Sequence, residues 1–138
     1  MTSPRPRVYL AGPDVFRPDA AQYFALLSAA CERLGLEALS PFDASVTAAT
    51  SPHRIYEANM AKLRAADGVV ANLAPFRGAE PDSGTVFEVG VAVALGVPVV
   101  AYGAAEAGAN LRNAAVHVDS AEEALQVLAE KLGTTSRA

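Results

Sequence analysis

The sequence is poor in cysteine, in basic charge and in long hydrophobic runs, and each shortage argues against a class of protein. The single cysteine, Cys31, has no disulfide mate in the chain and lies in an apolar helical pattern, which indicates a small buried side chain in a reducing compartment. The 11 lysines and arginines are outnumbered by 15 aspartates and glutamates, which disfavours a nucleic acid polymer as partner. No apolar run approaches the roughly 20 residues of a membrane span, so we expect no membrane partner.

The sequence also lacks the usual patterns of metal and phosphate sites. His53 and His117 have no metal-ligand spacing with Cys31 or with each other, so we expect no metal site. The glycines have neither the spacing of a phosphate-binding loop with lysine nor that of the dinucleotide fingerprint. The first residues, Met1 to Arg7, contain no apolar signal region, so we expect a cytoplasmic protein.

The chain does contain short apolar runs that alternate with helical patterns. Hydrophobic residues make up 51% of the 138 residues, so we expect a single domain over 1–138 that is frayed at 1–6 and 134–138. Strands that alternate with helices pair in parallel through right-handed crossovers, which predicts an α/β fold with a parallel sheet. The predicted strands are 8–11, 36–39, 69–73, 97–102 and 116–118, and the predicted helices are 19–34, 52–66, 84–95 and 121–132.

The loops after the first three strands are the expected place for a ligand. In open sheets of this kind, ligands bind at the carboxyl ends of the strands. The loops 12–16, 41–51 and 74–83 should therefore share one cleft.

Two carboxylates near the third of these loops are candidates for chemistry. Glu88 lies in the otherwise apolar run 86–95, where an unpaired buried carboxylate would be costly. Asp82 lies at the junction of loop and helix, where an acid that favours a helix N-terminus is the simpler alternative. Two carboxylates around a glycosidic bond can serve as nucleophile and as acid or base.

Four further residues could complete such a site. Tyr9 would donate a hydrogen bond to Glu88 if it pointed into the cleft, although a strand tyrosine is usually a core residue. Asp14 could contact a ligand or serve only in a turn. Asn59 lies inside a helix, where asparagine is a poor helix former, and an inward amide could read the edge of a heterocycle. Gly84 allows close approach to the backbone.

Several segments, taken in order, resemble the nucleoside 2-deoxyribosyltransferase family. They are Tyr9 to Phe16, Tyr56 to Asn59, Ala66 to Leu73, and Pro75 to Gly90, and the last of these is the most specific. The resemblance covers roughly Val8 to Leu111. It implies a doubly wound, flavodoxin-like domain with a five-stranded parallel sheet.

The resemblance also implies catalytic roles for three residues. Glu88 matches the family nucleophile that forms a deoxyribosyl-enzyme ester, and Tyr9 matches the tyrosine that orients it. Asp82 matches the aspartate that binds the sugar and handles protons. The implied reaction is a retaining double displacement between 2'-deoxynucleosides and free nucleobases, with release of base to water as a side reaction. It requires no metal and no organic cofactor, and it serves nucleotide salvage.

The remaining matches concern substrate binding and assembly. Phe16 matches an aromatic residue beside the base, and Asn59 stands where some members carry an aspartate that contacts the base. Asn110 matches an asparagine that reaches the sugar 5'-hydroxyl of a neighbouring subunit's ligand, so we expect a homo-oligomer with shared active sites. Arg112 departs from the apolar residue expected after Asn110 and Leu111.

Two other functions remain possible at this stage. One is a 2'-deoxynucleoside 5'-monophosphate N-glycosidase on the same fold, which Asp14 would oppose by repelling phosphate in the first loop. The other is a non-catalytic nucleotide-binding sensor module, which would need a pocket but no poised Glu88.

Overall fold

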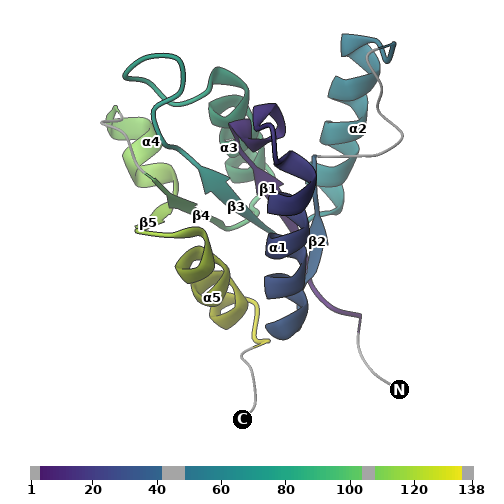
Figure 1. The fold of residues 1–138 in the computed structure, drawn as a ribbon. Coiled ribbons are helices and arrows are strands. Elements are labelled where there is room, and N and C mark those ends of the chain that lie inside the picture. The colour runs from purple at the N-terminus through teal and green to yellow at the C-terminus, as the bar shows by residue number, and fades with distance from the viewer. Residues whose placement is uncertain (1–3, 42–48, 104–107, 135–138) are drawn as a thin grey trace.

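The computed structural model describes residues 4–41, 49–103 and 108–134, and they build an open parallel sheet between helices (Figure 1). The strands pair in the order β2-β1-β3-β4-β5, and every pairing is parallel. Their bounds are β1 (Arg7–Ala11), β2 (Glu37–Leu39), β3 (Gly68–Asn72), β4 (Val99–Tyr102) and β5 (Val116–Val118). This is the flavodoxin-like strand order. The predicted α/β class with a five-stranded parallel sheet is therefore confirmed.

Helices cover both faces of this sheet and enclose two hydrophobic cores. One core joins the sheet to α1 (Ala20–Arg33) and α5 (Ala121–Lys131). The other joins it to α2 (Pro52–Ala65) and α3 (Ser83–Ala94), with the short α4 (Ala109–Ala114) beside it. Because both faces are buried, the strands are apolar throughout rather than alternating.

The alternation of side chains along β1 decides which residue faces which helix layer. Val8 and Leu10 belong to the core under α1 and α5, whereas Tyr9 and Ala11 belong to the core under α2 and α3. Tyr9 is completely buried. Its ring is thus a core residue, as the simpler reading of a strand tyrosine suggested, and it also points toward the helix that carries Glu88.

Two short helices were not predicted from the sequence. They are η1, a 3-10 helix over Pro13–Phe16 in the first loop, and α4. Neither has a side-chain hydrogen bond at its N-cap, so no local capping signal marks either helix. The fourth strand begins at Val99 rather than at Val97, and the other predicted elements match within about two residues at each end.

The structure also bears on the predictions made for Cys31, for membrane-spanning segments and for the chain ends. Cys31 is fully buried in α1, as predicted, and burial raises the pKa of its thiol to about 11. Among the helices of the described ranges, none has both the length and the apolar character that crossing a bilayer requires. Of the ends predicted to fray, residues 1–3 and 135–138 lie outside the described residues. The backbone N–H of Thr134 donates to the carbonyl of Ala129.

Candidate active site

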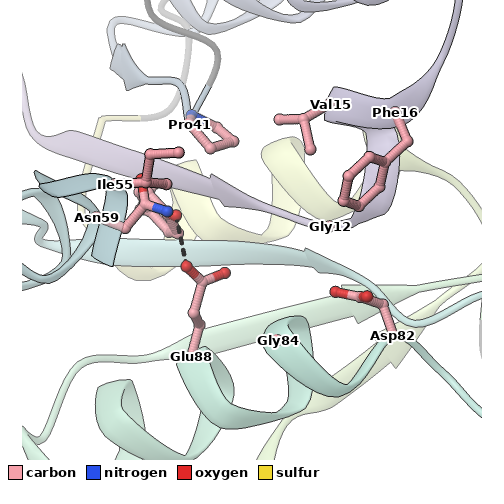
Figure 2. A pocket seen from close by; sticks show the side chains of 10 residues that line it. Gly12, Val15, Phe16, Pro41, Ile55, Asn59, Asp82, Gly84 and Glu88 are labelled. Carbon is pink, nitrogen blue, oxygen red and sulfur yellow. Dashed lines mark hydrogen bonds between the residues drawn. The ribbon is translucent and has the colours of Figure 1, made fainter. Parts of the chain in front are cut away.

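A cavity of about 500 Å³ opens at the carboxyl ends of the strands, on the side of α2 and α3 (Figure 2). Its wall combines the first loop, the start of the second loop, the end of the third loop and the two helices. The lining residues are Tyr9, Gly12, Val15, Phe16, Pro41, Ile55, Asn59, Asp82, Gly84 and Glu88. The prediction that the three loops share one cleft is therefore confirmed for the described residues, which omit 42–48.

Glu88 and Tyr9 meet at the floor of this cavity. The hydroxyl of Tyr9 donates a hydrogen bond to Oε2 of Glu88 at 2.7 Å, which joins β1 to α3. Burial raises the pKa of the Glu88 carboxyl, the Tyr9 hydroxyl lowers it, and the nearby Asp82 carboxylate raises it again, with a net rise. Burial and the Glu88 charge raise the pKa of Tyr9 far above its usual range, so the phenol stays protonated and remains a donor.

Asp82 begins α3 and faces the same cavity. Its Oδ2 atom accepts hydrogen bonds from the backbone N–H of Thr85 at 3.0 Å and from the Thr85 hydroxyl at 2.8 Å. Asp82 is thus the N-cap of α3, as the simpler alternative proposed, and it also lines the pocket. Gly84 lies so close that a Cβ there would approach Asp82 Oδ2 to 3.3 Å.

Sequence reasoning missed Thr85, which is 1% exposed and holds Asp82 through its hydroxyl. The spacing of an aspartate N-cap three residues before a threonine could have pointed to this contact. It also missed Ile55, although Ile55 and Asn59 lie one helical turn apart on α2 and so share a face.

An aromatic cluster, which we call the rim, extends from the cavity-lining Phe16 to Phe76 and Arg77, neither of which lines the cavity itself. Phe16 lines the cavity yet is 61% exposed, and its ring stacks on that of Phe76 with centroids 5.6 Å apart. The guanidinium carbon of Arg77 lies 5.2 Å from the Phe16 centroid and 4.6 Å from the Phe76 centroid. The rim therefore presents both an aromatic surface and a cation.

The structure does not bring Asp14 to the cavity. Asp14 is 7% exposed and does not belong to the cavity lining, and its two carboxylate oxygens accept from Nδ2 of Asn72 at 3.1 and 3.2 Å. The expectation that Asp14 would repel a phosphate in the ligand site therefore has no support in the geometry. A different argument replaces it. The described lining holds two carboxylates, Asp82 and Glu88, and no lysine, arginine or histidine.

Asn110 also lies outside the cavity of its own chain. It is an exposed residue of α4 and lines a separate groove with Glu80, Pro81, Val86, Gly108, Ala109 and Leu111. Arg112 is exposed on the same short helix. Since Asn110 does not line the cavity of its own chain, it would contact a bound ligand only in the cavity of a second chain.

Within the described residues, no three histidine, cysteine, aspartate or glutamate side chains gather closely enough to hold an ion.

Comparison with known proteins gives a family and several similar structures. Residues 8–128 match the sequence profile of a family described as nucleoside 2-deoxyribosyltransferase. A 2-desoxiribosyltransferase from Leishmania mexicana has a similar structure, with a TM-score of 0.79 and 29% identity over 91% of this chain and 97% of that chain. A CMP N-glycosidase from Clostridium botulinum shares the fold, with a TM-score of 0.61 and 22% identity over 88% of this chain and 97% of that chain.

One curated protein is also similar to this chain in sequence. It is an uncharacterised protein of Schizosaccharomyces pombe, 35% identical over 104 residues that make up 70% of this chain. The matched region is 49% of that protein, so this chain spans about half the length of its relative.

Proposed function

Since the chain belongs to the nucleoside 2-deoxyribosyltransferase family, we propose that it transfers the 2-deoxyribosyl group of a nucleoside from one nucleobase to another. The observation that carries this proposal is the hydrogen bond of 2.7 Å between Tyr9 and Glu88 at the floor of the cavity. A buried phenol that donates to a half-buried carboxylate beside a second carboxylate is an arrangement suited to glycosyl transfer.

The reaction would proceed in two displacements at the anomeric carbon. An oxygen of Glu88 attacks this carbon, the bond to the base nitrogen breaks, and the base leaves with the electron pair through an oxocarbenium-like transition state. A second base then attacks the same anomeric carbon and gives up its N–H proton, while the carbon–oxygen bond to Glu88 breaks and its electron pair returns to the carboxylate. The two inversions give net retention, and attack by water instead of a base gives hydrolysis as a side reaction.

Three residues beside the nucleophile would orient it, bind the sugar and transfer a proton. Tyr9 binds Oε2 of Glu88 and thereby orients the other oxygen for attack. Asp82 uses Oδ2 to cap α3, and among the described contacts its Oδ1 atom accepts no hydrogen bond, so that oxygen is available to bind sugar and exchange a proton. Gly84 leaves room for the sugar next to it.

Other residues would bind the base and complete the site. Asn59 offers an amide donor and acceptor to the edge of the base, and Phe16 offers a ring face. Asn110 of a neighbouring subunit would bond the 5'-hydroxyl, which makes the enzyme a homo-oligomer with shared sites. The substrates are 2'-deoxynucleosides and free nucleobases, and the reaction needs no metal or organic cofactor.

A second candidate is hydrolysis of a 2'-deoxynucleoside 5'-monophosphate. The observation that favours it is the Arg77 guanidinium at the aromatic rim, which could attract a phosphate. The two carboxylates and the absence of a cation in the described lining weigh against it, because a phosphate dianion would be repelled there. A non-catalytic sensor is the third candidate, but it would have no use for a nucleophile held by Tyr9.

The test is incubation of the protein with deoxyinosine and adenine, followed by product analysis. We expect deoxyadenosine, and we expect its formation to be abolished in Glu88→Ala while the fold is retained. The matched control is Glu122→Ala, the same change at an exposed glutamate of α5, which should keep full activity. An arabino-fluoro nucleoside, which is deglycosylated slowly, should label the wild-type protein covalently at Glu88, and mass spectrometry should detect the added mass at this residue.

Other outcomes would point to the other candidates. Free hypoxanthine alone, with faster release from deoxyinosine 5'-monophosphate, would indicate the N-glycosidase. Binding without turnover of either substrate would indicate the sensor. Covalent labelling at a residue other than Glu88 would overturn the assignment of the nucleophile.

A further inference from the structure

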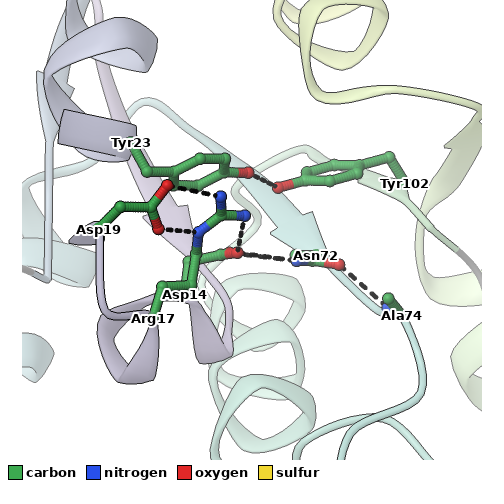
Figure 3. Close-up of polar contacts among 7 residues, drawn as sticks. All are labelled: Asp14, Arg17, Asp19, Tyr23, Asn72, Ala74 and Tyr102. Carbon is green, nitrogen blue, oxygen red and sulfur yellow. Dashed lines mark hydrogen bonds and ion pairs between the residues drawn. The ribbon is translucent and has the colours of Figure 1, made fainter.

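Asn72, the last residue of β3, joins loops that lie far apart in the sequence (Figure 3). Its Nδ2 atom donates to both carboxylate oxygens of Asp14, at 3.2 and 3.1 Å, in the loop after β1. Its Oδ1 atom accepts from the backbone N–H of Ala74, at 3.0 Å, in the loop after β3. A single amide therefore fixes the beginnings of both loops.

The carboxylate in this contact is unusual for its burial. Among the described residues, Asp14 is the only charged side chain in the buried class, at 7% exposed. A buried charge is costly unless it is hydrogen-bonded or paired, and Asn72 together with Arg17, at 4.0 Å, provides the partners. Since neither Asp14 nor Asn72 lines the cavity, the pair has no direct contact with a ligand there.

Two glycines make room for this pair. A Cβ at Gly12 would lie 2.8 Å from both Asn72 Cβ and Asp14 Oδ2, and a Cβ at Gly103 would lie 3.1 Å from Asn72 Oδ1. The distance at Gly12 is shorter than real Cβ atoms show unless the neighbour shifts, whereas the distance at Gly103 is tight and would require Asn72 to move by a few tenths of an ångström. The loop after β1 therefore requires glycine where it passes Asn72, and the loop after β4 favours it, since Gly103 also has a φ of 70°.

The two loops that Asn72 fixes also carry the two rings of the rim. Asp14 belongs to η1, which places Val15 and Phe16 in the cavity wall. The loop after β3 carries Phe76, whose ring stacks on Phe16 at an interplanar angle of 21°. The contact between Asp14 and Asn72 therefore links the two segments that carry the stacked rings.

We propose that Asp14 and Asn72 are a positioning pair that holds Phe16 against Phe76 at the mouth of the cavity and so sets how tightly the base is bound. The kinetic consequence rests on the proposed transferase function, whereas the structural consequence does not. Tyr9 and Glu88 are held by β1 and α3, so loss of the pair should weaken binding of the base much more than it slows the chemical step.

The kinetic test uses Asn72→Asp, Asp14→Asn and the double variant in which amide and carboxylate change places. Asn72→Asp puts two carboxylates face to face, and we expect KM for deoxyinosine to rise about tenfold to a hundredfold, with kcat changed by less than about threefold. Asp14→Asn should raise KM less, because two amides can still bond. The double variant should restore KM to within about threefold of wild type, since the carboxylate at position 72 can accept from both the amide at position 14 and the Ala74 N–H.

The matched control is Asp119→Asn, the same change at an exposed carboxylate after β5. Asp119 has no described hydrogen bond or ion pair with Asp14, Arg17 or Asn72, so KM should stay at the wild-type value. Equal effects in Asp119→Asn and Asp14→Asn, a fall in kcat without a rise in KM, or no rescue in a folded double variant would overturn the proposal.

A second readout does not need activity. The chain has five phenylalanines, and 4-fluorophenylalanine labelling gives fluorine resonances that Phe16→Leu and Phe76→Leu assign. We expect the Phe16 and Phe76 resonances to shift in Asn72→Asp and to return to their wild-type positions in the double variant. The resonance of Phe24 in α1 should stay in place in both variants. If Asn72→Asp does not fold, Asp14→Asn carries the same comparison. Unmoved rim resonances would overturn the proposal even in an active enzyme, whereas absence of transfer with the expected shifts would overturn only the proposed function.

Discussion

At the scale of single residues, the Glu88 carboxyl lies under opposing influences. Burial is the largest and raises its pKa, the Asp82 carboxylate raises it further, and the hydrogen bond from Tyr9 lowers it. The net direction is upward. Because only the ionised carboxylate can attack, a raised pKa means that activity is lost on acidification at a higher pH than for an ordinary glutamate.

This balance predicts opposite shifts of the pH profile in two variants. Tyr9→Phe removes the influence that lowers the pKa, so the acid limb of kcat/KM should move to higher pH. The chemical step should also slow by roughly one to two orders of magnitude, because a hydrogen bond to a charged group contributes about 1.5–3 kcal/mol. Asp82→Asn removes a charge that raises the pKa, so its acid limb should move to lower pH, while the amide oxygen can still cap α3.

The measurement is kcat/KM for deoxyinosine across the acidic range, with single-turnover rates for the chemical step. Glu57→Gln, at an exposed glutamate of α2, is the control and should leave the profile in place. Shifts of the two test variants in the same direction would contradict the electrostatic account of Glu88.

At the scale of elements, the positions of the cavity residues on a helix depend on how firmly the ends of that helix are held. Ser51 caps α2, with its hydroxyl oxygen accepting from the Arg54 N–H at 3.2 Å. Ser120 caps α5 in the same way, at 3.1 Å from the Glu123 N–H. The first helix carries Ile55 and Asn59 into the cavity, whereas the second covers the opposite face of the sheet.

The two caps therefore form a matched pair of predictions. Ser51→Ala and Ser120→Ala should each lower the free energy of unfolding by about 1 kcal/mol, because each leaves a backbone N–H of the first turn without its acceptor. Only Ser51→Ala should also raise KM, since fraying of α2 displaces Ile55 next to the lost cap. Urea unfolding and steady-state kinetics measure the two effects, and an equal rise of KM in both variants would contradict the local explanation.

At the scale of the whole molecule, one chain leaves its cavity open and its outer helix face apolar. Phe16 at the rim is 61% exposed, and on α2 and α3 the side chains of Tyr56 and Phe87 are 49% and 52% exposed with their rings in contact. Asn110 lies in a groove outside its own cavity. These features support the proposal of a homo-oligomer whose subunits complete each other's sites.

The prediction is complementation between two impaired variants. Inactive Glu88→Ala mixed with weakened Asn110→Ala, under conditions that exchange subunits, should give activity above that of either parent, because some mixed sites pair an intact Glu88 with an intact Asn110. Loss of one neutral hydrogen bond should by itself weaken binding by about 0.5–1.5 kcal/mol. Sedimentation establishes the oligomer, and tagged subunits establish exchange. No gain after demonstrated exchange would place Asn110 outside any shared site.

The sequence by itself determined the fold class and the position of the cavity. Apolar runs that alternate with helical patterns admit few topologies, because parallel strands need covered faces and right-handed crossovers. The loops at the carboxyl ends then had to converge, and Glu88 was conspicuous as a charge in an apolar run. From the residues alone, the pairing of Tyr9 with Glu88 was predicted only on the condition that Tyr9 points into the cleft, since the two residues are 79 positions apart; the family resemblance implied it as well.

Only the tertiary structure decided where Asp14 points and where short helices form. The partner of Asp14 is Asn72, 58 positions away, and no local pattern reveals a contact across that distance. Similarly, η1 and α4 span only four and six residues and have no side-chain cap, so neither is long enough to show a helical period in the sequence. Secondary structure follows from periodicities within a segment, whereas the direction of a loop side chain follows from neighbours that only the folded sheet brings together.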